Sequence, residues 1–406
     1  MNRLSVVDDM FLRSHRGLGT PIAMQGLWRF TDTVDRTVLG AVHRRLTLGP
    51  LARRVVRSRI PGARPRWVVA PESYPLTYDG RPVVDALGWA DAQPSNLDPS
   101  RGPGWRLSAT DLVDGSTVVS IVCSHVLTDA RGLILAVDRA LHDSPPSPPI
   151  TPGSDWRDAA RTWSRVVAQL RPRTIPRRDP IPHRGVRSAA TTSAVLDVAA
   201  EQWDDAARRT GGSANSLFVA LVTGILRASG AVASKARIDV AVPIGTRRDC
   251  YVGNAMTMTE VAVGPDDTPA DIRARARRAY LQPMSAPTGI PDELLQIVPD
   301  RIADVMARGS GERDVLCSNI GEIPPSFDAL AGARSTGVAT RAVHPDLTVR
   351  QLDRLRTRLS GYLCRSGSRV TLSLVGLDPD HIVSDTLVAD LALNELGRWG
   401  LTAQQW

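Results

Sequence analysis

Two proline-rich stretches near the middle of the chain set the first limit on its fold. The segments 142–156 and 171–187 interrupt helices and central strands, because proline lacks a backbone N–H and fixes φ. A chain of 406 residues is also too long for one ordinary core. We therefore expect an N-terminal subdomain over 1–155, a linker or crossing over 156–188, and a C-terminal subdomain over 189–406.

Strand and helix patterns alternate on both sides of this linker. The run 116–123 is almost continuously apolar and β-branched, which is typical of a strand buried on both faces. Strands are also predicted at 21–30 and, as a pair around a loop, at 236–263. Helical periodicity predicts helices at 35–58 and 211–230. The alternation predicts a fold of two mixed α/β sandwiches.

Several classes of protein are disfavoured by the distribution of apolar residues and cysteines. The chain has no run of 18 apolar residues, so we expect no transmembrane helix. Its first residues lack the apolar core of a signal peptide, which favours the cytoplasm. The four cysteines lie far apart and form no C-x-x-C pair, so neither a metal site nor a disulfide framework is predicted.

The net charge of +8 does not by itself indicate a nucleic-acid-binding protein. Lys235 is the only lysine, so nearly all basic residues are arginine, a bias typical of a GC-rich genome. Aromatic residues make up only 4% of the chain, which disfavours stacking on single strands. A basic surface can still attract an acidic carrier protein or a phosphate-bearing cofactor.

Standard catalytic signatures are missing from the sequence. It contains no G-x-S-x-G elbow, no phosphate-binding G-x-x-x-x-G-K-[ST] loop, no G-x-G-x-x-G fingerprint and no H-E-x-x-H pair. These absences weaken the hydrolase, nucleotide-binding, dinucleotide-binding and zinc-protease interpretations.

The remaining candidate is the pair of His125 and Asp129, which follows the predicted buried strand. The imidazole should emerge where the sheet ends, and the carboxylate can pin the turn, so the histidine can exchange a proton near neutral pH. The same spacing recurs at His381 and Asp385, where we expect Asp385 to cap the final helix. Spacing alone therefore leaves open whether His125 is catalytic or an ordinary residue at a strand end.

Around this pair the sequence resembles a known superfamily. The segment "SHVLTDA" (124–130) is similar to the H-x-x-x-D-G signature of the condensation-domain and chloramphenicol acetyltransferase-like acyltransferases. Within this superfamily, the sequence most resembles the wax ester synthase/diacylglycerol acyltransferase and stand-alone condensation-enzyme branches. Further segments resemble the family in the same order, namely "LSVVDDMFL" (4–12), "SANSLFVALVTGILR" (213–227), "PIGTRR" (243–248), "GN" (253–254) and "CSNIGEIP" (317–324).

Two positions depart from the family signature. Ser124 stands where several branches carry an additional histidine, and Ala130 replaces the glycine that follows the aspartate. We expect the Cβ of Ala130 to crowd a turn that needs close backbone approach, with Gly132 able to relieve it.

The resemblance implies a fold of two chloramphenicol acetyltransferase-like subdomains in a V-shaped pseudo-dimer with a central tunnel. It implies that His125 is a general base, and that Asp129 is structural and bonded to Arg247. An acyl group would pass from a coenzyme A or carrier-protein phosphopantetheine thioester to an amine or alcohol of a small natural-product acceptor. No bound cofactor or metal is implied. Residues expected to line the tunnel or the oxyanion site are Ser124, Ser318 and Asn319, whereas Gly253 and Asn254 are expected to shape a loop.

Two alternatives remain open at this point. The same fold can guide a cyclisation, elimination or hydrolysis without an acyl donor. It can also serve as a non-catalytic binding protein, an alternative favoured by the departures at Ser124 and Ala130. Expected partners are a small-molecule acceptor and, where the thioester is carrier-bound, an acyl or peptidyl carrier protein, with neither nucleic acid nor integral membrane association.

Overall fold

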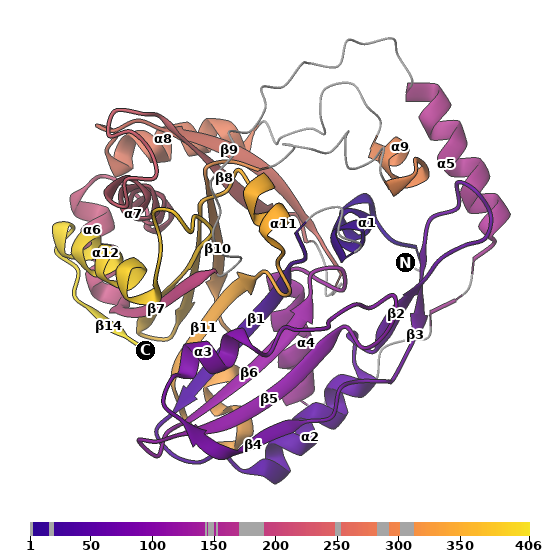
Figure 1. Ribbon diagram of the computed structural model, residues 1–406, viewed down its shortest axis with the longest axis horizontal. Helices are drawn as coiled ribbons and strands as arrows, with labels where there is room; N and C mark the ends of the chain where they lie inside the picture. Colours follow the sequence, from indigo (N-terminus) through magenta and orange to yellow (C-terminus); the bar gives the residue numbers. More distant parts are fainter. Residues whose placement is uncertain are drawn as a thin grey trace.

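The described residues form two large β-sheets that meet along one side and carry helices on their outer faces, together with one two-stranded sheet (Figure 1). This mixed α/β architecture confirms the predicted fold class. The computed structural model describes residues 3–15, 20–142, 144, 150–151, 153–169, 191–247, 253–281, 292–300 and 312–406.

The first sheet is built around a strand that is buried along its whole length. Its order is β11-β1-β6-β5-β4, and all eight residues of β6 are buried, as the unbroken apolar pattern predicts. Its strands are β1 (Ala23–Phe30), β4 (Thr77–Val83), β5 (Trp105–Leu112), β6 (Thr117–Ser124) and β11 (Ser335–Val343). One apolar cluster joins the sheet to the helices on its outer face, which are α2 (Arg36–Leu48), α4 (Ala130–Leu141) and the 3-10 helix η2 (Pro325–Gly332).

The second sheet has the order β14-β7-β13-β12-β10-β8-β9. Its strands are β7 (Thr192–Ala199), β8 (Ile238–Gly245), β9 (Met256–Val263), β10 (Val315–Glu322), β12 (Leu359–Ser366), β13 (Arg369–Gly376) and β14 (Ala403–Gln405). The helices that pack with it are α6 (Ala200–Arg209), α7 (Ala214–Ala228), α8 (Pro269–Tyr280) and α12 (Asp385–Arg398). Helix α7 is buried on most sides and begins at Ser213, whose side chain accepts a hydrogen bond from the Ser216 N–H.

The two halves are joined by β11, a strand from late in the chain. It pairs antiparallel with β1 from Ala23 and Val343 onward, and it also lies against β12 and β13 of the second sheet. A small apolar cluster at this junction contains Leu27 and Ala339 of the first sheet and Val195 of the second. Residues 335–343 therefore complete the sheet of the opposite half, so a division of the chain at one residue does not separate the two sheets.

A group of smaller elements lies on the right of Figure 1. It contains α1 (Val6–Arg13), α5 (Asp155–Gln169) and α9 (Asp292–Ile297), together with the hairpin of β2 (Arg53–Val56) and β3 (Arg66–Val69). The Arg13 side chain of α1 donates to the Asp300 carboxylate and to the Val298 carbonyl oxygen, both just beyond α9. The remaining short helices are α3 (Ala86–Asp91) and α11 (Val349–Arg354).

One predicted boundary is wrong for a local reason. The helix predicted at 35–58 ends at Leu48, because Gly49 and Pro50 follow it and the chain then turns into β2. Within the expected linker, 156–169 is helical and belongs to α5, while 170–188 lies outside the described residues, so the bounds of the linker stay a prediction.

Three cysteines, Cys123, Cys317 and Cys364, are free and buried, while Cys250 lies outside the described residues. Among the helices that the structure describes, none is long and apolar enough to cross a membrane.

Candidate active site

His125 is held at the end of the buried strand β6. Its backbone N–H donates to the Ile22 carbonyl oxygen over 2.9 Å, which extends the pairing with the β1 segment by one residue beyond Ser124. Only 8% of its surface is exposed. The imidazole therefore lies at the end of the central strand β6, where other residues cover it.

Asp129 fixes the turn that follows His125. Its Oδ1 accepts the Gly132 N–H over 2.8 Å and so caps α4, and the same oxygen is bonded by the Arg247 guanidinium. Its Oδ2 accepts the Ala255 N–H over 2.8 Å. Both Asp129 and Arg247 are about nine-tenths buried. The carboxylate thus binds the turn to the segment between β8 and β9 of the other half.

Asn254, which the sequence suggested only as a loop residue, lies directly against His125. Its Oδ1 is 3.1 Å from His125 Nδ1, and its Nδ2 donates to the His125 carbonyl oxygen over 2.8 Å. The same Nδ2 donates to Asp8 Oδ1 over 2.7 Å. The site therefore combines β6 with one loop from the second half and with helix α1.

Helix α1 covers the histidine with one face. Phe11 stacks on the His125 ring, with 3.7 Å between centroids and 15° between planes. One turn further, His15 Nε2 lies 2.9 Å from Ser124 Oγ. Asp8 and Phe11 are three residues apart in α1, which places them on the same side of the helix, and His15 follows just beyond its C-cap, Ser14. This spacing is the signal in the sequence that indicates a shared face.

A second imidazole, that of His15, therefore lies against the residue that precedes His125. Ser124 occupies that position and is fully buried, and its hydroxyl meets the ring of His15. Burial lowers the pKa of His15, and the nearby Asp98 charge opposes this shift. Two imidazoles, those of His125 and His15, thus lie at the end of β6.

Burial also lowers the pKa of His125. A hydrogen bond with its own backbone, the negative charge of Asp129 and the hydrogen bond with Asn254 act in the opposite direction and raise that pKa. The ring is consequently uncharged at neutral pH and has a lone pair available to accept a proton. A buried neutral imidazole is the form that a general base requires.

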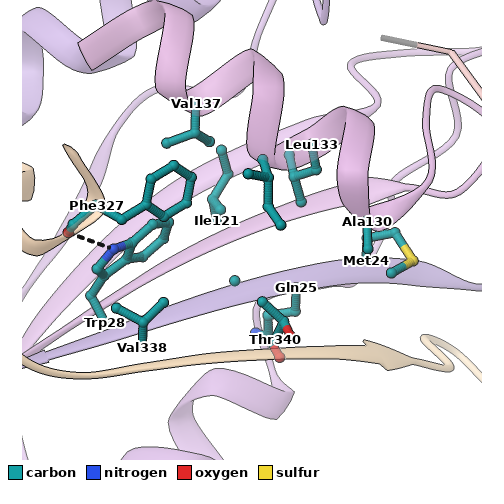
Figure 2. Close-up of a pocket in the computed structure, with 12 residues that line it drawn as sticks. Met24, Gln25, Trp28, Ile121, Ala130, Leu133, Val137, Phe327, Val338 and Thr340 are labelled. Atoms are coloured by element: carbon teal, nitrogen blue, oxygen red, sulfur yellow. Dashed lines mark hydrogen bonds between the residues drawn. The ribbon is translucent and has the colours of Figure 1, made fainter. Parts of the chain in front are cut away.

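Ala130 does not need the backbone freedom of glycine, and whether its Cβ restricts the site stays a prediction. It is the first residue of α4 and does not adopt a positive φ, so its backbone needs no glycine. Figure 2 shows its side chain beside Met24, at one end of a small apolar cavity between α4 and the first sheet. Trp28 and Phe327 close the other end of this cavity.

The remaining predicted residues lie apart from these contacts. Ser318 and Asn319 belong to β10, and Asn319 is exposed, with its amide directed to Asn215 of α7. His125 lines neither the apolar cavity behind α4 nor a second, polar cavity beside His344, so a tunnel through the site stays a prediction. Within the described part of the chain, no cluster of three or more His, Cys, Asp or Glu residues is arranged to hold a metal ion.

No protein-family model matches the chain, and no curated protein matches its sequence. Solved structures match it over nearly its whole length. The wax ester synthase/diacylglycerol acyltransferase from Marinobacter aquaeolei VT8 is 16% identical, with a TM-score of 0.60 and 98% of each chain covered. The first condensation domain of the CDA synthetase is 16% identical, with a TM-score of 0.57 and coverage of 97% of this chain and 96% of that one.

A third match is F. sporotrichioides TRI101, whose structure contains coenzyme A and T-2. It is 14% identical, with a TM-score of 0.56 and 99% of each chain covered. Sequence identities this low show that the fold is shared, but they do not show that the chemistry is shared. The chain therefore shares the fold of these three proteins over at least 97% of its length, with one sheet of five strands and one of seven.

Proposed function

We propose that the protein is an acyltransferase or condensation enzyme that forms an ester or amide from an acyl thioester and a small-molecule alcohol or amine. The observation that carries this proposal is the buried His125 at the end of β6, whose pKa is lowered by that burial. It lies where segments of both halves meet, which is where a donor and an acceptor can be brought together.

In this proposal His125 acts on the acceptor. The imidazole takes the proton of the hydroxyl or amine while its oxygen or nitrogen attacks the thioester carbonyl carbon. The C–S bond then breaks, and the proton passes to the thiolate leaving group. General-base assistance of this kind is worth about 10²–10⁴ in rate, and holding both substrates together contributes further. Asp129 and Arg247 hold the turn and take no proton.

The donor is proposed from the fold relatives and from charge. TRI101 was solved with coenzyme A, and another structure with the same fold is the first condensation domain of the CDA synthetase. The net charge of +8 favours a phosphate-bearing thioester, whether on coenzyme A or on an acidic carrier protein. Ser124, Ser318 and Asn319 remain candidates for lining the route of the donor or for contacting the carbonyl oxygen.

The test is product formation from a panel of coenzyme A and pantetheine thioesters with amine and alcohol acceptors, read by mass spectrometry. His125→Gln is expected to lower transfer by about 10²–10⁴ while the protein keeps its unfolding midpoint. His381→Gln is the matched control, because that histidine has the same spacing to an aspartate and is expected to leave transfer unchanged. Equal turnover by His125→Gln and the wild type would refute the proposal.

One observation favours a second candidate, a condensation-like binding protein without catalysis. Phe11 covers one face of His125, and the ring is only 8% exposed. This candidate predicts thioester or acceptor binding without product, and it predicts that Phe11→Ala, which uncovers the ring, produces none either. Product from the wild type eliminates it.

A further inference from the structure

We infer that Asn254 and Asp8 are positioning residues that hold the proton of His125 on Nδ1 and leave Nε2 as the atom able to act as a base. The catalytic meaning of this inference rests on the proposed function, whereas the placement of the proton does not. Neither residue belongs to the H-x-x-x-D segment, and each comes from a different part of the chain.

The orientation of the Asn254 amide follows from its partners. Its nitrogen donates to the Asp8 carboxylate over 2.7 Å and to the His125 carbonyl oxygen over 2.8 Å. A backbone carbonyl oxygen can only accept, and so can an ionised carboxylate. The amide nitrogen must therefore face these two groups, and the amide oxygen must face His125.

That orientation determines the tautomer of His125. The amide oxygen lies 3.1 Å from Nδ1 and has no proton to give. Two lone pairs facing each other at this distance would repel, so Nδ1 carries the hydrogen. In a neutral imidazole the other nitrogen, Nε2, then holds the free lone pair.

Asp8 is fixed firmly enough to impose this arrangement. It is fully buried, and its Oδ2 accepts the Ser5 N–H over 2.9 Å in the capping box of α1, so each carboxylate oxygen has a partner. Burial raises the pKa of Asp8, while Asn254, Ser5 and the Arg53 charge oppose the shift. If Asp8 takes up a proton, the His125 carbonyl oxygen still holds the amide in the same orientation.

The ring is also restrained against rotation. Phe11 of the same helix stacks on one face, and Asn254 occupies the Nδ1 edge. Both restraints leave Nε2 on the opposite edge of the ring. Helix α1 thus contributes Asp8 to the polar side of the histidine and Phe11 to its apolar side. These contacts hold the ring in one orientation, which a general base requires in order to meet the proton that it takes.

The experiment is NMR of the full-length protein carrying ¹⁵N-labelled histidine, at a pH where His125 is neutral. Two-bond ¹H–¹⁵N correlations distinguish a protonated ring nitrogen from an unprotonated one. The His125 signals are assigned by their loss in His125→Gln. The wild type is expected to have Nδ1 protonated and Nε2 unprotonated. A wild-type His125 with its proton on Nε2 would overturn the inference.

Asn254→Ala is expected to shift the tautomer ratio of His125 by about tenfold towards Nε2–H, the effect of one hydrogen bond of ordinary strength. Asn215→Ala is the matched control, because that amide bonds Tyr280 and not the histidine. An unchanged ratio in folded Asn254→Ala contradicts the inference.

Asp8→Asn provides a second variant if Asn254→Ala does not fold. It keeps the side-chain shape but weakens the anchor of Asn254, so it should shift the ratio in the same direction by a smaller factor. Asp9→Asn, the neighbouring buried acid that pairs with Arg13, is its control. No shift in Asp8→Asn removes Asp8 from the proposal. Because none of these readouts uses turnover, failure to find transferase activity leaves this result unaffected.

Discussion

His125–Asp129 and His381–Asp385 share one spacing in the sequence and lie in opposite environments. His125 is 8% and Asp129 6% exposed. The His381 side chain is 40% exposed and bonds Asp378, three residues earlier. The same spacing therefore occurs once in a buried environment and once in an exposed one.

The expected role of Asp385 as a helix cap is wrong. Ser384 is the N-cap of α12 and accepts the Leu387 N–H, while Asp385 is the first helical residue and accepts the Ser193 N–H. At the first site, by contrast, the aspartate is itself the cap and also binds an arginine from the other half. What distinguishes the two is thus the residues supplied from elsewhere in the chain, namely Arg247, Asn254 and the face of α1.

The largest difference should follow removal of the two aspartates. Asp129→Ala leaves the Arg247 charge buried without its carboxylate, and two further nitrogens of that guanidinium already lack a partner among the described residues. Breaking a buried pair in this way costs about 3–5 kcal/mol. Asp385→Ala, at an exposed first turn, should cost about 1 kcal/mol or less. Urea unfolding measures both, and equal losses would remove the distinction between the two sites.

A smaller difference should appear in the pH dependence of stability. Burial lowers the pKa of His125 below the 6.5 of an ordinary histidine. Below pH 6.5 the unfolded chain therefore binds a proton at this residue that the folded chain does not, so the free energy of unfolding falls as the pH falls. His125→Gln removes this contribution. Between pH 7.5 and pH 5.5 its free energy of unfolding should therefore fall less than that of the wild type, by at most about 1 kcal/mol.

Unfolding curves of the wild type, His125→Gln and His381→Gln at the two pH values check this expectation. The comparison between the two sites breaks down if His381→Gln changes the pH dependence by as much as His125→Gln does.

The smallest effect concerns the residue after the first aspartate. Ala130→Gly restores the glycine of the family signature at the first position of α4. Because the backbone there is helical, we expect a loss of about 0.5–1 kcal/mol or less, from the greater freedom of glycine in the unfolded chain. Transfer activity should stay within about twofold, a change of under 1 kcal/mol in barrier. An increase of tenfold or more would mean that the Ala130 Cβ does restrict the site.

The fold was more accessible to sequence reasoning than the site. The strand 116–123 could be predicted from its continuous apolar run, and the helix 211–230 from the helical spacing of its apolar residues. Both patterns lie within consecutive residues. The pairing of β1 with β11 could not, because it joins positions about 300 residues apart and depends on tertiary packing.

Within the site, the residues on the turn were found and those that support it were not. Asp129 and Arg247 were suggested together by the resemblance, and the two side chains meet in the structure. Asp8 and Phe11 belong to helix α1, and His15 follows just beyond its C-cap. Nothing in their sequence indicates that they contact the end of β6. Asn254 was noted only as part of a loop, since no pattern indicates which histidine an asparagine contacts.

The position of β11 has a consequence for how the chain is made. On the ribosome, β1, β5 and β6 emerge early, and one edge of β1 has no partner until residues 335–343 have been synthesised. At about 5–20 residues per second, that interval lasts on the order of tens of seconds. An unpaired strand edge is a template for aggregation. A nascent chain halted before residue 335 should therefore depend on chaperones more than the finished protein does.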